Sequence, residues 1–171
     1  MGWSPGDRIG ADFRLVSPLG ENLRVWKAKR VSGGGAVAVT FASDGDGPLD
    51  PVTRARFASG AKLRQELEHP NLLPSIGFGV AEGVPYTASP RVEGESLAAR
   101  LKRERVLPPD TLRDLLGQLG AALSHAHEHG VVHRDLRPEN VLLPQGDDER
   151  VLALVAAFHK DEVRQGASIY C

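Results

Sequence analysis

One segment of this sequence carries side chains whose types and spacing could do chemistry. It covers residues 131–143, which read Val-Val-His-Arg-Asp-Leu-Arg-Pro-Glu-Asn-Val-Leu-Leu. The carboxylate of Asp135 is of the type that accepts protons in catalysis, and the amide of Asn140 follows it in the same segment. Asp and Asn side chains also hydrogen-bond the backbone of the loops that carry them. The segment therefore leaves a catalytic and an architectural interpretation open.

A run of histidines just before this segment is a candidate for metal binding. His125 and His129 stand at positions i and i+4 of an expected helix, so they share one face. The zinc pattern H-E-x-x-H is absent, because the run, with His127 in its centre, reads His-Ala-His-Glu-His. We therefore expect no metal site here.

The elements that must position these residues belong to a chain of 171 residues, of which 41% are hydrophobic and 25% charged. Those fractions are typical of one globular domain. The net charge of −1 points to neither nucleic acid nor an anionic membrane. The single cysteine, Cys171, excludes an internal disulfide and suits a reducing compartment. The longest apolar run, 151–158, is far short of the ~20 residues that cross a bilayer, so we expect a cytoplasmic protein.

Short strands are expected in the first half of the chain and helices in the second, after a polar entry segment at 1–10. Apolar alternation and turn signals predict strands at 13–19, 22–31, 36–42, 73–80 and 85–89, and two short ones at 141–143 and 151–155. Helical spacing predicts helices at 51–68, 95–103 and 110–129. Asp50 and Pro51 suit the start of the first helix, and Gly130 suits the end of the last.

With these elements around it, the segment 131–143 matches the protein-kinase catalytic-loop pattern H-R-D-L-x-x-x-N. The chain resembles the bacterial, eukaryotic-like Ser/Thr protein kinases over essentially its whole length. Residues 37–40 occupy the place of the V-A-I-K motif, 69–71 match the H-P-N after helix αC, and 92–97 resemble the segment after the hinge.

The resemblance implies an α+β fold in one partial kinase-like domain, 1–171. Residues 1–90 would form the N-lobe, a small five-stranded antiparallel sheet with one αC-type helix. Residues 91–171 would form an incomplete, mostly helical C-lobe that ends before the A-P-E motif. ATP binds between the two lobes in this family.

The phosphate-binding parts of the family are altered. Phosphoryl transfer depends on positioned charges. The Gly-rich loop keeps only its first glycine, Gly20, and is two residues short. Thr40 stands where the family has the strand lysine. Lys27 and Lys29 lie on the adjacent strand and are expected to be solvated edge charges rather than substitutes for that lysine.

The acidic partners are altered as well. Gly60 stands at the position of the αC glutamate, and Val155 at the position of the D-F-G aspartate. Asn140 alone would be a poor anchor for a magnesium ion, which needs several oxygen ligands. We therefore expect no metal site and no firmly bound cofactor, although ATP could bind without well-held magnesium.

The surviving motif positions are expected to be vestigial. They are Asp135, the potential base for a substrate hydroxyl, Asn140, the second metal ligand, and Arg137, which replaces the usual lysine. Candidates to line an adenine pocket are Gly20, Val25 and Ala38.

These observations predict a pseudokinase module that binds or regulates a protein partner. Two alternatives stay open: a weak or unconventional ATP-dependent Ser/Thr kinase with Asp135 as base, and a relic without selected function.

The helix 110–129 carries an apolar stripe that would pack on further C-lobe helices in the family. Left exposed, such a stripe marks a partner surface, so we expect a protein partner or a homodimer at this C-lobe face. The stripe consists of Leu112, Leu115, Leu116, Leu119, Leu123 and Ala126.

Overall fold

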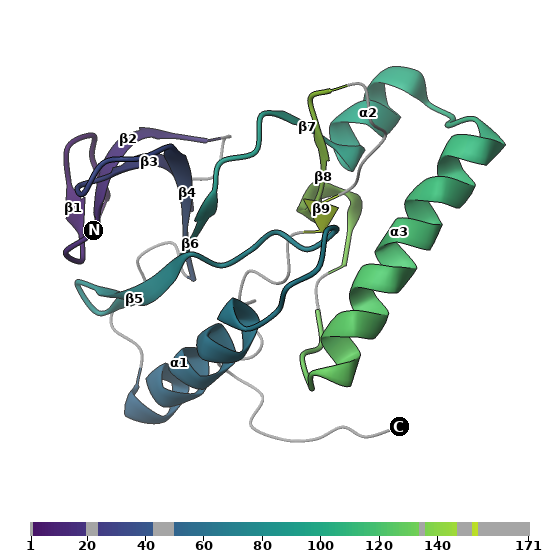
Figure 1. The fold of residues 1–171 in the computed structure, drawn as a ribbon. Helices are drawn as coiled ribbons and strands as arrows, with labels where there is room; N and C mark the ends of the chain where they lie inside the picture. Colours follow the sequence, from purple (N-terminus) through teal and green to yellow (C-terminus); the bar gives the residue numbers. More distant parts are fainter. Residues whose placement is uncertain (1, 20–23, 43–49, 134–135, 147–151, 154–171) are drawn as a thin grey trace.

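The computed structural model describes residues 2–19, 24–42, 50–133, 136–146 and 152–153. These residues form two lobes, a β-sheet with one helix and a second lobe built mainly on helices (Figure 1). The predicted α+β, protein-kinase-like class is confirmed. No helix among the described residues is long and apolar enough to cross a membrane.

The first lobe contains one antiparallel sheet with the strand order β1-β2-β3-β4-β6-β5. Alternation explains these strands, because every second residue of β4 is buried while those between are exposed or half-buried. The predicted strands at 13–19, 22–31 and 36–42 are confirmed with slightly tighter bounds. The strands are β1 (Arg8–Ile9), β2 (Phe13–Pro18), β3 (Val25–Arg30), β4 (Ala36–Phe41), β5 (Gly77–Ala81) and β6 (Val84–Pro90).

The N-terminal segment is part of this core, so its interpretation as a polar entry segment was wrong. Ile9 of β1 is fully buried and pairs with Phe13 of β2. The strand β1 is therefore a sixth strand, added to the five that the family resemblance implied. Trp3 stacks on Phe41, with ring centroids 4.5 Å apart and an interplanar angle of 12°. Two apolar side chains spaced far apart in a polar stretch gave no periodic signal.

The helix α1 (Pro51–Gln65) packs against β5 and β6. Its start is as predicted, since the Asp50 carboxylate accepts a hydrogen bond from the Val52 N–H at 3.0 Å. Phe57 and Ala61 are buried on one face. The helix ends before the predicted residue 68, because its last turn tightens into i to i−3 hydrogen bonds ahead of the His69-Pro70 step.

The second lobe combines two helices with a small sheet of order β7-β8-β9. Ser96 caps its first helix by accepting a hydrogen bond from the Ala99 N–H at 3.2 Å. The strand before that cap was not predicted, because it is three residues long and runs directly into the helix. The elements are β7 (Gly94–Ser96), α2 (Leu97–Glu104), α3 (Pro109–Glu128), the short 3₁₀ helix η1 (Pro138–Asn140), β8 (Val141–Pro144) and β9 (Leu152–Ala153).

The apolar stripe of α3 is divided between the core and the surface. Leu115 and Leu119 are buried, whereas Leu112 and Leu116 are 45% and 58% exposed. The prediction of one continuous apolar stripe is corrected. It combined the leucines that face the core with leucines beside them that face solvent. Gly130 has a φ of 72° directly after the helix, as expected of its C-terminal stop.

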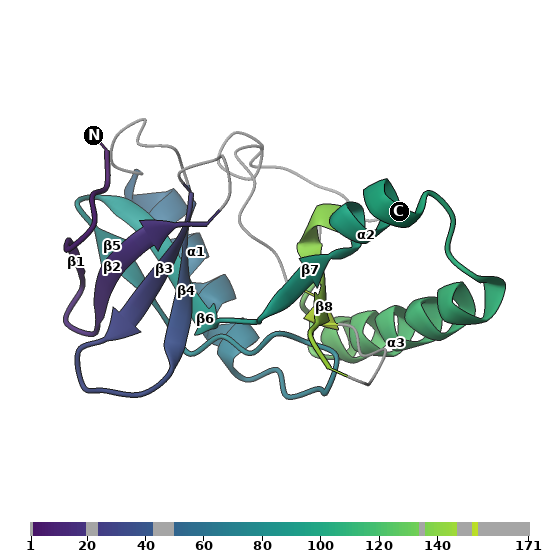
Figure 2. The ribbon, with the colours of Figure 1, turned by 90° about the horizontal axis from the view of Figure 1, so that it is seen from above.

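Two hydrophobic clusters follow the two lobes, and one segment joins them. The first cluster lies inside the six-stranded sheet. The second lies under α3 and includes Leu67 and Leu72 from the connection between α1 and β5. Figure 2 shows a second link, where the chain after β6 crosses from the sheet to the second lobe. The chain segments that follow α1 and β6 therefore hold the lobes together.

Candidate functional site

One face of the sheet carries the residues expected to line a nucleotide cleft. Val25 pairs directly with Thr40, and Thr40 pairs with Thr87. Ala38 lies two residues before Thr40, so its side chain is on the same face. All four residues are half-buried, whereas Val39 between them is fully buried on the core side. The structure therefore brings Val25 and Ala38 together on a partly covered face of the sheet, which they share with Thr40 and Thr87.

This face has a neutral centre where the family places a cation. Thr40 lies between Val25 on one neighbouring strand and Thr87 on the other. The strands β3, β4 and β6, which build this face, contain no aspartate or glutamate. These strands therefore supply no carboxylate for a metal ion.

Lys27 is the basic side chain that shares this face. It pairs directly with Ala38 and is half-buried, whereas Lys29 is exposed. The prediction of solvated edge charges holds for Lys29 only in its exposure and is wrong for Lys27, because β3 lies inside the sheet between β2 and β4. The signal that could have found Lys27 is its even spacing from Val25 along the strand.

The helix α1 offers no carboxylate at the position of the αC glutamate. Gly60 lies in the middle of α1. The nearest acidic residues, Glu66 and Glu68, follow the end of the helix and are exposed. The predicted joint loss of the strand lysine and its acidic partner is consistent with this arrangement, since a buried ion pair that loses one member leaves a costly unpaired charge.

The loop after α1 is docked on α3 by polar contacts. The Asn71 amide donates a hydrogen bond to the Gln118 Oε1 at 2.7 Å. The Asn71 backbone N–H donates to the Nδ1 of His69 at 3.1 Å. The His69 ring lies against His125, with ring centroids 5.3 Å apart. Burial, and secondly the like charge of His125, lower the pKa of His69.

Two histidines of the run in α3, His125 and His129, lie against each other. The His125 and His129 rings lie 4.4 Å apart between centroids, and the His129 Nδ1 lies 2.8 Å from the backbone oxygen of His125. His127 is exposed. In the part of the chain that the structure describes, no group of three histidine, cysteine or acidic residues is arranged to hold a metal ion.

The segment 131–143 is described in part. His133 is buried. Arg137 precedes η1, and its backbone oxygen accepts a hydrogen bond from the Asn140 N–H at 2.9 Å. Asp135 lies outside the described residues, so the structure does not test its role as a base. The backbones of Asn140 and Arg137 thus meet at one tight turn, and the roles of their side chains stay predictions.

Two further predicted positions also lie outside the described residues. Gly20 precedes β3 in the sequence and is one of the residues 20–23, which are not described. Val155 comes two residues after the end of β9, whose Ala153 pairs with Val141 of β8. The assignment of Val155 to the D-F-G position stays a prediction from sequence.

Comparisons with known proteins agree with this geometry. The family model of the protein kinase domain matches residues 20–155. The serine/threonine-protein kinase PknE of Mycobacterium tuberculosis is 37% identical over 98 residues, which cover 57% of this chain and 17% of PknE. The serine/threonine-protein kinase pkn3 of Myxococcus xanthus is 34% identical over 161 residues, covering 90% of this chain and 28% of pkn3. The chain thus spans less than a third of the length of these relatives.

Solved structures show the same fold. The crystal structure of the Mycobacterium tuberculosis PknI kinase domain superposes with a TM-score of 0.80 at 23% identity, covering 98% of this chain and 71% of that one. Rad53 1–466 in complex with AMP-PNP superposes with a TM-score of 0.69 at 24% identity, covering 85% of this chain and 38% of that one. The two-lobed arrangement described above is therefore that of these solved kinase structures.

Proposed function

This chain belongs to the protein kinase domain family, and from that membership we propose that it is a pseudokinase module, which binds or regulates a protein partner and does not transfer phosphate. The observation that carries the proposal is Thr40, a neutral side chain at the centre of the cleft face of the sheet. Removing one preorganised group that stabilises charge costs about 10²–10³ in rate. Gly60 in the middle of α1 adds a second loss to the same phosphate-binding region.

The described residues fit one part of ATP and not the other. Val25 and Ala38 form an apolar floor that suits an adenine ring. Magnesium and the phosphates it bridges need several oxygen ligands and a nearby cation. The strands of the floor hold no carboxylate. We therefore derive no catalytic step through magnesium-bound ATP.

A thermal-shift titration with ATP, with and without magnesium, tests the proposal. A ligand that binds the folded state must raise its melting temperature. We expect no rise that depends on magnesium, and no transfer of labelled phosphate to a general protein substrate. Asp135→Asn is the matched variant, and it should behave like the wild-type chain in both assays. A magnesium-dependent rise together with transfer that Asp135→Asn abolishes would overturn the proposal.

A second candidate is an unconventional ATP-dependent kinase, and the position of Lys27 favours it. Lys27 is half-buried on the same face as Thr40, so its ammonium group can substitute for the missing strand lysine. In that case Lys27→Met abolishes any ATP-dependent shift, whereas Lys29→Met, which changes an exposed lysine two residues later, leaves it intact. Equal behaviour of the two variants excludes this candidate.

The proposed binding surface is the exposed side of α3. Leu112 and Leu116 lie one helical turn apart and are 45% and 58% exposed. Adjacent exposed leucines on one helix face mark an interaction surface. We place a protein partner or a second copy of the chain there, in the cytoplasm, and we include no nucleic acid or membrane among the partners. The net charge of −1 supports the exclusion of both polyanions.

A further inference from the structure

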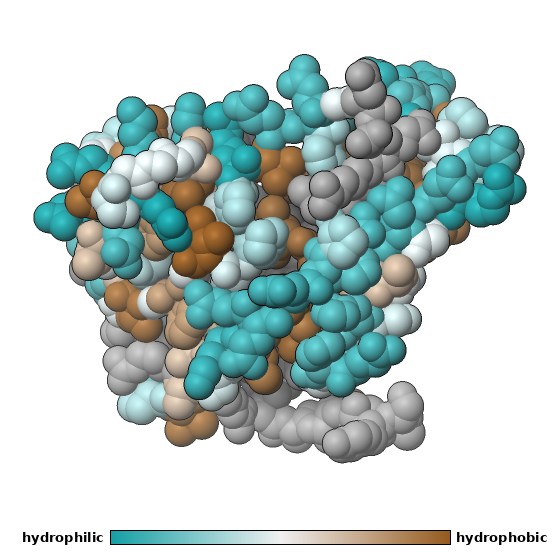
Figure 3. All heavy atoms as spheres, viewed as in Figure 1, coloured by the Kyte–Doolittle hydropathy of each residue, from teal (hydrophilic) through white to brown (hydrophobic). Residues whose placement is uncertain are grey.

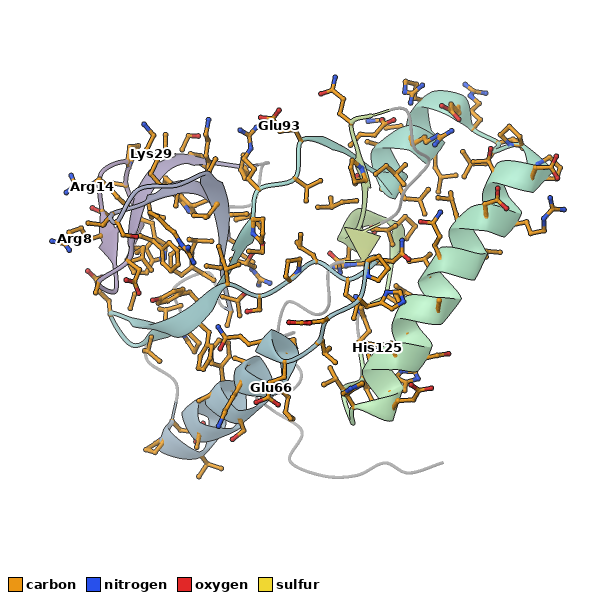
Figure 4. All side chains as sticks on the ribbon, viewed as in Figure 1. Arg8, Arg14, Lys29, Glu66, Glu93 and His125 are labelled. Atoms are coloured by element: carbon orange, nitrogen blue, oxygen red, sulfur yellow. The ribbon has the colours of Figure 1, made fainter. Side chains whose placement is uncertain are left out.

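A row of three cations crosses the N-terminal sheet on its exposed face, close to the edge strand β1. Arg8 of β1 pairs directly with Arg14 of β2, and Arg14 pairs directly with Lys29 of β3. Residues directly opposite each other in a sheet point to the same face. All three side chains are exposed. Figure 4 shows them together at the β1–β3 end of the sheet, where they project away from the rest of the molecule.

This row runs against the usual pairing rule of sheets. Like charges directly opposite each other on neighbouring strands are destabilising. The β strands lie about 4.8 Å apart, so the three side chains start from adjacent positions. Arg8 donates a hydrogen bond to the backbone oxygen of Ala11 at 3.3 Å, which leaves its charge in place. In the described part of the chain, no carboxylate lies within ion-pair distance of Arg8, Arg14 or Lys29. An external anion would therefore relieve a repulsion that the fold itself leaves uncompensated.

The nearby acidic side chains are engaged elsewhere or lie on turns. The Asp7 carboxylate accepts a hydrogen bond from the Ser4 N–H at 2.8 Å. Asp12 lies in the turn between β1 and β2 and acts on the buried Tyr86, whose pKa is raised by burial and secondly by that carboxylate. The surface over this end of the sheet is hydrophilic in Figure 3. A compact anion can therefore reach the row without displacing apolar side chains.

We propose that Arg8, Arg14 and Lys29 form a binding site for the phosphate group of a phosphorylated serine or threonine on a partner peptide. Two guanidinium groups can each offer a fork of donors to phosphate oxygens, and the ammonium group adds a third charge. A phosphate dianion has three acceptor oxygens and more charge than one carboxylate. The site does not involve α3. It lies on the same face of the sheet as Val25 and Lys27, because Lys29 follows Lys27 by two residues along β3, but toward the β1 edge of that face.

The size of the row favours a single phosphorylated side chain over a polyanionic surface. Duplex DNA and anionic membranes are bound through many phosphates at once. The row contains three cations on a chain whose net charge is −1. That arrangement suits one group with concentrated charge better than an extended field.

The test is fluorescence anisotropy with a labelled peptide that carries one phosphothreonine in an uncharged sequence. The intact chain should bind this peptide, and should bind the same peptide with plain threonine or with glutamate at least about tenfold more weakly. The affinity should fall as the ionic strength rises to about 0.15 M. Arg14→Gln, at the centre of the row, should weaken binding about tenfold or more. Arg113→Gln is the matched control, because Arg113 is exposed on α3 and pairs with Asp110.

A second variant and two other probes keep the outcome decisive. Lys29→Gln should weaken binding in the same direction as Arg14→Gln, and the melting temperature of each variant checks that it is folded. Equal binding of the phosphorylated and plain peptides, or no effect of both variants, overturns the proposal. Tighter binding to phosphatidylserine vesicles or to duplex DNA than to the phosphopeptide also overturns it, because the row would then be a general polyanion surface.

Discussion

At the scale of single residues, Thr40 fits its strand well, although the protein kinase family has a lysine at this position. A β-branched side chain suits a strand position with neighbours on both sides, and Thr40 has Val25 and Thr87 directly opposite. A lysine at this site would bring a charge to a half-buried face, and α1, with Gly60 in its middle, contains no aspartate or glutamate to pair with it. The neutral side chain of Thr40 is therefore consistent with these surroundings.

His69 gives a prediction about pH at the same scale. Its pKa is lowered, first by burial and then by the like charge of His125. The Nδ1 of His69 accepts the Asn71 N–H at 3.1 Å, which requires an unprotonated nitrogen. A group whose pKa is lower in the folded state than in the unfolded state favours unfolding when it is protonated. Stability from His69 is therefore complete above the unfolded pKa of about 6.5 and is lost as the pH falls toward the lowered folded pKa.

Urea unfolding of the wild-type chain and of His69→Gln, at pH values above and below this window, checks the sign. The wild-type chain should lose more free energy of unfolding than His69→Gln when the pH falls. Gln retains a polar side chain of similar reach but does not titrate. An equal loss in both proteins would show that the effect of pH arises elsewhere.

At the scale of elements, the glycines of α3 and of β7 give opposite predictions. Gly117 and Gly120 lie inside α3, and a Cβ at either position would have no heavy atom within 4 Å. Gly117→Ala and Gly120→Ala should each raise the free energy of unfolding by about 0.5–1 kcal/mol, because alanine loses less backbone entropy in a helix. Gly94 differs, since its φ is +154° and a Cβ there would overlap the carbonyl oxygen of Leu143.

Gly94→Ala is thus the contrasting variant in the same lobe. It should lower the free energy of unfolding, because the backbone of β8 must move to admit the methyl group. Thermal and urea unfolding of the three variants measure both directions. Stabilisation by Gly94→Ala, or destabilisation by both α3 variants, would contradict the assigned geometry.

The elements that sequence predicted are those with a regular signal. Alternating burial defines β2, β3 and β4, and an Asp cap followed by proline defines the start of α1. The short strands β1 and β7 were missed, because two or three residues cannot establish a period. Periodicity predicted the apolar stripe of α3 as a whole. It could not predict which of its leucines are buried and which are exposed, because that depends on what each side of the helix packs against.

For the candidate site, the sequence motifs predicted which residues stand at the family's motif positions. The motif match assigned Thr40 and Val25 to neighbouring strands, and the register of β3 and β4 pairs the two residues directly. The half-buried position of Lys27 and the contact between Asn71 and Gln118 depend on strand order and on the approach of two distant segments. Neither has a local signature in the sequence.

At the scale of the whole molecule, the two lobes share their stability through the segment that follows α1. Leu67 and Leu72 belong to the core under α3, although α1 itself packs on the sheet. Asn71 adds a hydrogen bond to Gln118 on α3 at 2.7 Å. The segment that follows α1 is therefore packed into the second lobe by both apolar side chains and a hydrogen bond.

The exposed leucines of α3 give the last prediction. Water-exposed apolar neighbours favour association, since burying each leucine against a partner removes apolar area from water. Light scattering of the wild-type chain should show an average mass that rises with concentration. The double variant Leu112→Gln, Leu116→Gln should abolish that rise. It should change the melting temperature little, because Leu112 is 45% and Leu116 58% exposed in the single chain. Leu63→Gln on α1 is the matched control, since Leu63 is also 45% exposed. A wild-type chain that stays monomeric at high concentration would exclude self-association, and self-association that survives the double variant would assign it to another surface.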